Sequence, residues 1–272
     1  MLFPFALLSL ITTAVISAVS NMVWPTYLWA VPLMFVGFFV GWILLYVIFL
    51  LLVSFFTDTK KEYESRSAFI HRLVICTVAA ILGIFRVKPS VSGSELIPAD
   101  SRWLLVSNHR SGFDPIVAFW VLRRHELAFI AKPSIFKIPI AKQLLTRDFS
   151  MSIDRENNRE ALKTILKAAE LIKKDITSIG IYPEGTRTKD GNMLPFRSGA
   201  FKIAQRAKVP IVVATIEGTE SIMKHFPLRS TKAKLIIHQV FDADTVAELS
   251  TNELSDKAQE IMLSHLGRQV YE

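Results

Sequence analysis

Residues 108–114, Asn-His-Arg-Ser-Gly-Phe-Asp, hold the side chains best suited to acid–base chemistry. A histidine paired with a carboxylate can act as a general base, because the carboxylate fixes the imidazole tautomer and stabilises the protonated ring. On a single helix, two residues five positions apart point about 140° away from each other. His109 and Asp114 can therefore meet only if His109 lies in a loop and Asp114 starts a helix, a turn that Gly112 permits. The structural alternative is that Asp114 serves only as the helix N-cap.

A second polar group, Tyr-Pro-Glu-Gly-Thr-Arg at residues 182–187, follows a predicted strand. Gly185 allows close approach to the backbone, while the Thr186 hydroxyl and the Arg187 guanidinium suit a phosphate or a carboxylate. The sequence contains no Gly-x-Ser-x-Gly, so a serine nucleophile is not indicated. Without a serine nucleophile, the sequence favours direct attack on an activated acyl donor by a substrate hydroxyl that His109 deprotonates.

Two single cations add to the candidates for anion binding. Arg155 ends the segment Ser-Ile-Asp-Arg, and Lys132 follows the apolar run of residues 127–131. A surface turn explains Arg155 equally well, and a solvated lysine is the usual state of a residue such as Lys132. Neither residue identifies a site by itself.

The scaffold that must position these residues is predicted from the alternation of strands and helices after Pro89. Apolar runs predict strands, and amphipathic segments between them predict helices, one of which begins at Asp114-Pro115. Such alternation is typical of an α/β domain with a mixed, partly parallel sheet flanked by helices. The predicted strands are 103–107, 127–131, 176–182, 209–216 and 235–241, and the other predicted helices are 159–174, 198–207 and one that begins with the capping box Ser250–Glu253.

The first 57 residues contain no charged side chain, and all 32 Lys and Arg and 24 Asp and Glu follow Thr57. Leu2–Ser20 suits one membrane crossing and residues 29–56 suit a longer one, with a turn at Asn21–Tyr27 between them. A hairpin returns the chain to its starting side. The basic residues that follow, Lys60, Lys61 and Arg66, predict that this side and the rest of the chain are cytoplasmic.

Two alternatives for this segment remain open. Residues 1–20 could be a cleaved signal peptide, although no basic residue precedes the apolar run. The second run could be buried in a soluble core, which its length disfavours. The apolar stretch within residues 68–87 is too short to span a membrane, so an interfacial or partly buried helix is predicted there. This helix contains Cys76, the single cysteine of the sequence. The expected organisation is a hairpin (1–57), a basic linker with an interfacial helix (58–90) and a catalytic domain (91–272).

The polar groups, taken in their order along the chain, resemble a known family more specifically than any one of them does alone. Residues 103–220 resemble the 1-acyl-glycerol-3-phosphate acyltransferase family of the glycerolipid acyltransferases in six blocks: NHRSGFD, AKPSIFKIP, SIDR, YPEGTR, FRSGAFKIA and VPIVVA. The specific part is the His-x-x-x-x-Asp block followed about 70 residues later by Pro-Glu-Gly-Thr-Arg. The resemblance implies a glycerolipid acyltransferase fold behind the membrane hairpin.

The resemblance also implies roles for the candidate residues. It assigns the catalytic base to His109 and the orienting carboxylate to Asp114. It assigns binding of the acceptor phosphate to Arg155 and to Gly185, Thr186 and Arg187, with Glu184 in the same motif and Lys132 as a further candidate. The implied reaction moves a fatty acyl group from acyl-CoA or acyl-carrier protein to the 2-hydroxyl of lysophosphatidate and gives phosphatidate. The donor is a co-substrate, and neither a resident cofactor nor a metal is expected.

The charge composition indicates which classes of binding partner to expect. A formal charge of +8 next to a membrane favours anionic lipid and anionic donors such as CoA or an acidic carrier protein. No nucleic-acid-binding motif accompanies the charge, so nucleic acid is not an expected partner. Two other interpretations remain: an acyltransferase with another lysophospholipid, glycerol 3-phosphate or lyso-aminolipid as acceptor, and a non-catalytic membrane protein that binds lipid. Acyl transfer by the purified protein separates them.

Overall fold

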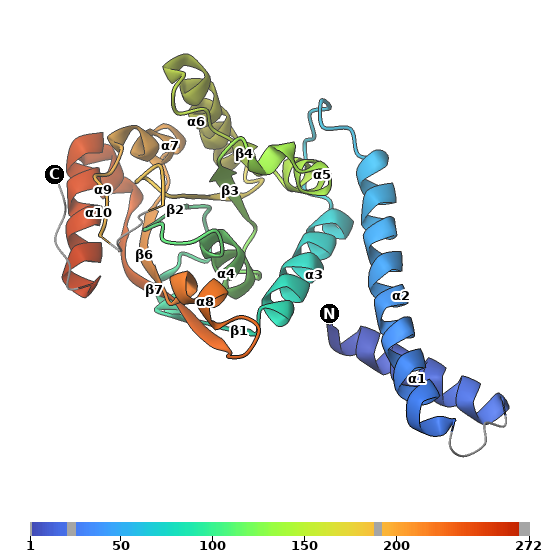
Figure 1. Cartoon of the computed structure of the whole chain (residues 1–272). Helices are drawn as coiled ribbons and strands as arrows, with labels where there is room; N and C mark the ends of the chain where they lie inside the picture. The colour runs from blue at the N-terminus through green and yellow to red at the C-terminus, as the bar shows by residue number, and fades with distance from the viewer. Residues whose placement is uncertain (1, 21–25, 188–191, 267–272) are drawn as a thin grey trace. The chain divides into compact units, whose positions relative to one another are not determined.

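The computed structural model describes residues 2–20, 26–187 and 192–266 (Figure 1). Contacts divide the chain into two compact units, Met1–Asp58 and Thr59–Glu272. The stretch of residues 59–90, expected as a linker with an interfacial helix, thus belongs to the same compact unit as the remainder of the chain.

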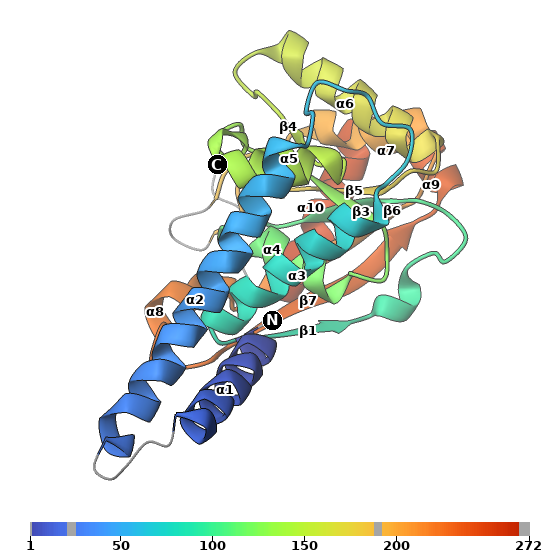
Figure 2. The same ribbon diagram turned by 90° about the vertical axis from the view of Figure 1, so that its right-hand side faces the viewer.

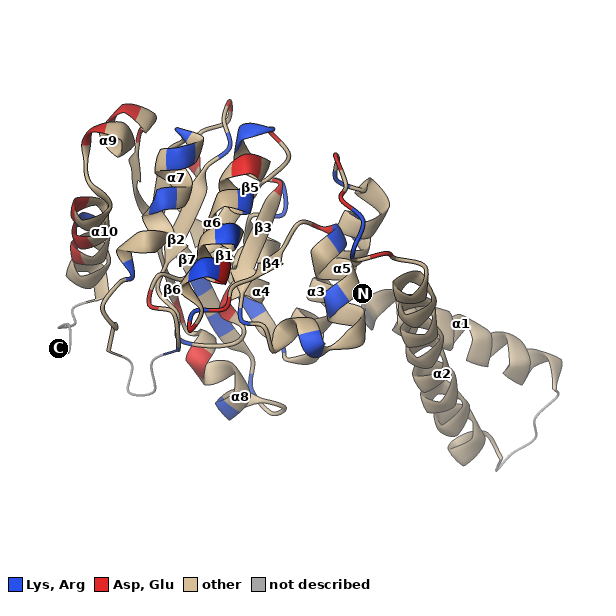
Figure 3. Ribbon diagram, turned by 90° about the horizontal axis from the view of Figure 1, so that it is seen from above, with Lys and Arg blue, Asp and Glu red and all other residues tan. Residues whose placement is uncertain are grey.

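The first unit is a pair of apolar helices, α1 (Leu2–Val19) and α2 (Tyr27–Phe55). The ring of Phe5, early in α1, lies 5.7 Å from the ring of Tyr46, late in α2, so the helices run antiparallel. Figure 3 shows both without a charged residue. In the described part of the chain, α2 alone is long and apolar enough to cross a membrane, and α1 is shorter at 18 residues. Most of the predicted turn, residues 21–25, lies outside the described residues.

The second unit is built on one seven-stranded sheet in the order β1-β7-β6-β2-β5-β3-β4. Strands β6, β2, β5, β3 and β4 run parallel, while β7 pairs antiparallel with β6 and parallel with β1. The predicted mixed, partly parallel α/β sheet is therefore confirmed. The strands are β1 (Val87–Ser92), β2 (Leu104–Ser107), β3 (Leu127–Ala131), β4 (Met151–Ser152), β5 (Ser178–Ile181), β6 (Ile211–Glu217) and β7 (Thr231–Phe241).

Helices cover both faces of this sheet (Figure 2). On one face, α6, α7 and α10 pack in a common core with Leu104 and Val106 of β2, and α3 and α4 lie against the other face. The central strands are apolar on both faces because both are covered. The helices are α3 (Ala68–Ile84), α4 (Asp114–Val121), α5 (Pro139–Arg147), α6 (Asn158–Lys173), α7 (Lys202–Ala207), α8 (Ile222–His225), α9 (Ala243–Glu248) and α10 (Thr251–Leu266).

Two helices differ from the prediction: residues 198–207 divide into a 3₁₀ helix (Ser198–Phe201) and α7, and α6 is rotated about its axis. The capping box at the start of α10 forms as predicted, because Ser250 Oγ accepts from the Glu253 N–H while Glu253 accepts from the Ser250 N–H. In α6, however, Leu162 and Leu166 are 47% and 44% exposed, although periodicity places them on the buried face. The helix is rotated so that Ala168 and Leu171 are buried in addition to the predicted Ile165, Ala169 and Ile172.

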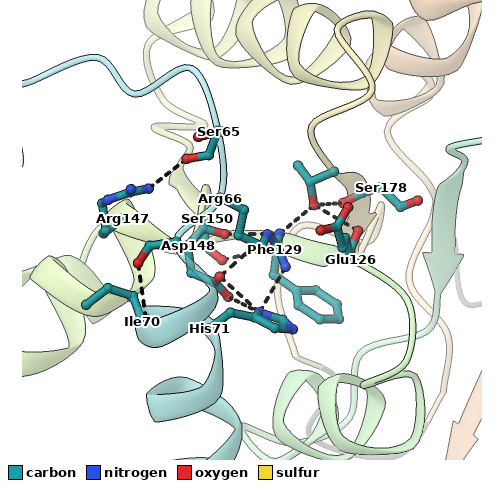
Figure 4. A network of polar contacts seen from close by, with 12 residues as sticks. Ser65, Arg66, Ile70, His71, Glu126, Phe129, Arg147, Asp148, Ser150 and Ser178 are labelled. Atoms are coloured by element: carbon teal, nitrogen blue, oxygen red, sulfur yellow. Dashed lines mark hydrogen bonds and ion pairs between the residues drawn. The ribbon is translucent and has the colours of Figure 1, made fainter.

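A buried polar network holds the segment before α3 against the sheet (Figure 4). The Arg66 guanidinium donates to Thr177 Oγ1 at 2.6 Å and has its Nε 3.6 Å from Asp148 Oδ1. His71 Nδ1 lies 3.0 Å from the same carboxylate oxygen. Burial lowers the pKa of Arg66, and the charge of Asp148 opposes that shift. Arg66, one of the three predicted topology-setting cations, is therefore the centre of an internal ion pair.

Replacing Asp148 with asparagine should lower the free energy of unfolding by about 3–5 kcal/mol, because it leaves the Arg66 charge buried without its counter-charge. Chemical denaturation of the detergent-solubilised chain measures this change. Glu156→Gln, which removes an exposed carboxylate, is the matched control and should shift the free energy by less than about 0.5 kcal/mol. Equal effects of the two substitutions would contradict a stabilising role for the network.

Candidate active site

The candidate catalytic pair forms as the spacing requires. His109 lies in the loop after β2, Asp114 is the first residue of α4, and His109 Nδ1 is 2.8 Å from Asp114 Oδ2. Asp114 is fully buried, whereas the His109 side chain retains 17% of its exposure. Because Nδ1 is engaged by the carboxylate, the other ring nitrogen, Nε2, is left for a substrate proton.

Asp114 is not the N-cap of α4, which corrects the structural alternative. The N-cap is Phe113, and the Asp114 carboxylate turns back to accept the Arg110 and Ser111 N–H groups at 2.6 and 2.8 Å. These hydrogen bonds from two backbone N–H groups, together with the contact to the imidazole, fix the orientation of the carboxylate. Asp114 therefore shapes the loop as well as holding the His109 ring.

Thr219 supplies the remaining partner of Asp114. Its buried hydroxyl donates to Asp114 Oδ1, and its neighbour Glu220 pairs with Arg110 at 3.1 Å. Thr219 follows β6, and β6 lies beside β2, so both loops leave the sheet at the same edge. Gly218 makes this turn with φ +80°, and a Cβ there would lie 2.2 Å from the Lys232 carbonyl oxygen. The loop after β6 thus supports the Asp114 carboxylate.

Replacing Thr219 with valine should lower kcat about 5- to 100-fold and leave KM for the acceptor nearly unchanged, because the variant keeps the shape but leaves Asp114 Oδ1 without a donor. Thr219→Ser should restore most of kcat. Steady-state kinetics on both variants measures the effect. Thr215→Val is the control, since Thr215 is equally buried but its hydroxyl bonds to His238. A KM effect without a kcat effect would assign Thr219 to substrate binding instead.

Glu184 joins the two predicted motifs. Its carboxylate accepts two backbone hydrogen bonds: Oε1 accepts from the backbone N–H of His109 at 2.6 Å, and Oε2 accepts from the backbone N–H of Leu194 at 3.1 Å. Glu184 is only 5% exposed, and its two hydrogen bonds join two loops, while its substrate-binding role stays a prediction. Burial raises its pKa to about 7, against the lowering effect of the two N–H groups.

The raised pKa of Glu184 predicts a pH-dependent stability. A carboxyl group whose folded pKa is about 7 and whose ordinary pKa is 4.5 binds its proton more tightly in the folded chain. Stability from this group is therefore present at low pH and is lost as the pH rises from about 5 to 7, by about 3 kcal/mol. The difference in unfolding free energy between wild type and Glu184→Gln should shift by this amount, in favour of the variant, between pH 5 and 8. If the unfolding free energies of wild type and Glu184→Gln change with pH in parallel, the raised pKa of Glu184 is contradicted.

Tyr182 links the catalytic pair to the neighbouring cavity. Its ring stacks on the His109 imidazole, with centroids 4.4 Å apart, and on Phe129 at 5.9 Å on the sheet. Burial raises the pKa of the Tyr182 hydroxyl well above its ordinary value, with a further contribution from the charge of Asp114. The imidazole is thus held by a carboxylate at its edge and by an aromatic ring at its face.

A cavity of about 350 Å³ lies beside Tyr182. Arg155, Arg197 and Lys202 contribute positive charge, and Leu162 and Ile165 of α6 contribute an apolar wall. Burial lowers the pKa of Arg155, and the nearby charge of Arg197 lowers it further. None of the described residues that line the cavity is acidic. Guanidinium groups that have no acidic neighbour among the described lining residues and lie next to apolar side chains suit an anion attached to an aliphatic chain.

Gly185 connects this cavity to the Glu184 loop. Its φ is +78°, and a Cβ would lie 3.0 Å from Arg197 Nε and 3.6 Å from Arg155 Cδ. The Arg197 N–H donates to the Pro183 carbonyl at 3.0 Å, which fixes Arg197 beside the motif. The structure therefore brings Gly185 and Arg155 together as predicted, and it adds Arg197.

The remaining predicted residues lie elsewhere. Thr186 and Arg187 are exposed, and Arg187 Nη1 lies 3.6 Å from the Cβ position of Gly112, on the catalytic loop. Arg187 therefore borders the His109 loop, whereas Arg155 lines the cavity. Lys132 is exposed after β3, a strand parallel to β5. In the described ranges, no group of three or more His, Cys, Asp or Glu side chains is placed to hold a metal ion.

Sequence reasoning missed two residues of this arrangement, Thr219 and Arg197. Arg197 stands in the block FRSGAFKIA, so its position in a matching block was the available signal. Thr219 follows a glycine directly after a predicted strand, a pattern common to many loops. Its contact with Asp114 crosses 105 residues of sequence.

Comparison with known proteins identifies similar sequences and one similar fold. Residues 88–217 match the family model described as Acyltransferase. A chloroplastic 1-acyl-sn-glycerol-3-phosphate acyltransferase of Brassica napus is 32% identical over 176 residues, which cover 62% of this chain and 50% of the relative. One of Cocos nucifera is 32% identical over 148 residues, which cover 54% of this chain and 47% of the relative. The chain thus spans about half the length of these curated relatives.

A solved structure extends the likeness to the fold. The 1-acyl-sn-glycerophosphate (LPA) acyltransferase PlsC from Thermotoga maritima matches over 100% of both chains with a TM-score of 0.61 and 22% identity. The family match encloses the residues that the fold brings together, from His109 to Arg197. Residues 88–217 therefore resemble the acyltransferase family, and the predicted resemblance of the chain to the 1-acyl-glycerol-3-phosphate acyltransferases is confirmed.

Proposed function

We propose that this chain transfers a fatty acyl group from acyl-CoA or acyl-carrier protein to the 2-hydroxyl of 1-acyl-glycerol 3-phosphate and so forms phosphatidate. The observation that supports this most directly is the His109–Asp114 pair, held 2.8 Å apart at the edge of a cationic and apolar cavity. The relatives named as 1-acyl-sn-glycerol-3-phosphate acyltransferases support the choice of acceptor.

In this mechanism His109 Nε2 takes the proton from the acceptor 2-hydroxyl as its oxygen attacks the thioester carbonyl of the donor. The ring becomes an imidazolium, which the Asp114 carboxylate stabilises through Nδ1. The tetrahedral intermediate collapses, the carbon–sulfur bond breaks, and the proton passes from His109 to the departing thiolate. The enzyme ends in its starting protonation state, so the donor is a co-substrate and the step calls for no resident cofactor.

The acceptor phosphate is assigned to the cavity beside Tyr182. Arg155 and Arg197 can each donate charge-assisted hydrogen bonds to phosphate oxygens, and the planar guanidinium suits two oxygens at once. Tyr182 borders both the cavity and His109, so a headgroup in the cavity lies close to the base. A phosphate monoester carries more charge than a diester, which favours lysophosphatidate over other lysophospholipids.

The apolar helices α1 and α2 are assigned to membrane attachment. Helix α2 meets the length and composition of a membrane span, and its Trp29, Leu33 and Phe55 are more than 60% exposed in the structure. With Arg66 internal, Lys60 and Lys61 remain as the exposed basic residues after α2. They favour a catalytic unit on the cytoplasmic side.

The test is acyl transfer by the purified full chain in mixed micelles, over a panel of donors and acceptors. Phosphatidate formed from a thioester donor and lysophosphatidate is the expected product. Preference for another lysophospholipid or a lyso-aminolipid would change the acceptor and keep the chemistry. Binding of lysophosphatidate without transfer from any donor would support a non-catalytic lipid-binding protein and overturn the proposal.

A further inference from the structure

Exposed apolar side chains gather where the end of α3 meets the loop after α8. The exposed fractions are 45% for Ile84, 62% for Met223, 38% for Phe226 and 83% for Leu228. The Arg86 guanidinium donates to the carbonyl oxygens of Pro227 and Leu228 at 3.2 and 3.3 Å, which joins the two segments. Figures 1 and 2 both show α8 beside the C-terminal end of α3. We call these four apolar residues, with Arg86, Lys224 and Arg229, the docking patch.

The charge of the docking patch has one sign. Arg86, Lys224 and Arg229 are exposed, and residues 222–232 contain no Asp or Glu. The nearest acidic residue along the chain, Glu220, is engaged by Arg110. Exposed apolar side chains accompanied by cations match the interface of an anionic bilayer, where the apolar side chains enter the acyl boundary and the cations meet the headgroups.

The docking patch is continuous with the catalytic loop. Phe85, at the end of α3, lies 4.8 Å from Phe226 in the patch and 4.8 Å from Phe113, measured between ring centroids. Phe113 directly precedes Asp114, in the loop that carries His109. Helix α8 follows β6, which runs parallel to β2, so patch and catalytic loop share one edge of the sheet.

We infer that the docking patch binds the surface of an anionic lipid bilayer and holds the catalytic edge of the sheet against it. This contact is separate from attachment through α1 and α2, and its benefit to catalysis rests on the proposed function. An acceptor and a product that both reside in the bilayer would then enter and leave along the Phe85–Phe113–Phe226 cluster without crossing water.

The test uses the full chain in lipid vesicles, with a fluorescent thiol probe at one position at a time. Because Cys76 is the single cysteine, Cys76→Ala gives a background for labelling. The probe is placed at Leu228→Cys and, as the matched control, at Leu166→Cys on α6, which is 44% exposed and also apolar. Vesicles contain phosphatidylcholine with or without phosphatidylglycerol, and spin-labelled lipids quench probes that reach the bilayer.

Quenching at position 228 should exceed quenching at 166 several-fold in anionic vesicles, since α1 and α2 anchor both proteins equally. Lys224→Gln with Arg229→Gln should reduce this difference and remove its dependence on phosphatidylglycerol. Equal quenching of the probes at positions 228 and 166 overturns the inference. A cross-link between the cysteines introduced at position 228 in two copies of the Leu228→Cys chain, without quenching by lipid, also overturns it and would assign the patch to contact with a second copy. Transfer by the same labelled proteins reports the proposed function separately: transfer without quenching leaves that function standing, and quenching without transfer leaves the patch standing.

Discussion

Replacing His109 with alanine should lower kcat by about 10²–10⁴-fold while lysophosphatidate still binds, because the variant loses the group that takes the 2-hydroxyl proton. The effect reaches this size because no other described residue offers an imidazole at this edge next to a buried carboxylate and the cavity. Single-turnover transfer, with separate equilibrium binding of the acceptor, measures both quantities.

A matched control is available in His125, which lies before β3 and packs edge-on against Trp103, at the opposite edge of the sheet from the His109 loop. His125→Ala should change kcat little. The kcat of Asp114→Asn should lie between those of His109→Ala and His125→Ala, since asparagine keeps the size of aspartate but weakens the interaction with a protonated His109 ring. A normal kcat in His109→Ala would end the general-base mechanism, whatever the other variants show.

The second large effect is expected for the acceptor phosphate. Arg197→Ala and Arg155→Ala should each raise KM for lysophosphatidate about 10- to 100-fold, because each removes charge-assisted hydrogen bonds worth about 1.5–3 kcal/mol. Lysine at either position should recover only part of the loss, since it keeps the charge without the planar guanidinium. Initial rates over a range of acceptor concentrations give KM and kcat.

The controls separate phosphate binding from damage to the fold. Arg206→Ala, at an exposed arginine of α7 that does not line the cavity, should leave KM unchanged. Monoacylglycerol, which lacks the phosphate, should be a poor acceptor for wild type and should respond little to loss of Arg155 or Arg197. If Arg187→Ala instead shows the phosphate-dependent loss, the headgroup lies beside the His109 loop and the cavity must hold another part of a substrate.

The local predictions held where short-range physics decides the outcome. Gly112 and the start of a helix at Asp114-Pro115 determine that His109 and Asp114 can meet, and the structure confirms the distance. Periodicity located α6 but not its rotation, because Leu162 and Ala168 are both acceptable on a half-buried face. Which residues become buried depends on the packing of α6 against the sheet.

The catalytic support, in contrast, rests on contacts between distant segments. The bond from the His109 N–H to Glu184 crosses 75 residues, that from Thr219 to Asp114 crosses 105, and the approach of Arg66 to Asp148 crosses 82. The first two depend on strand order, because β2 lies between β6 and β5. A sequence shows that a strand is apolar but not which strand lies beside it.

The sequence by itself determined the division at the first charge, the α/β class, the acid–base pair and the family blocks, because charge, periodicity and turn residues act over a few positions. Tertiary structure decided that Glu184 is an internal brace, that Arg66 is buried, and that Arg197 joins Arg155 while Arg187 borders the other loop. The physical reason is that a polar side chain is exposed or buried according to its neighbours in space. Those neighbours are set by the order of strands in the sheet.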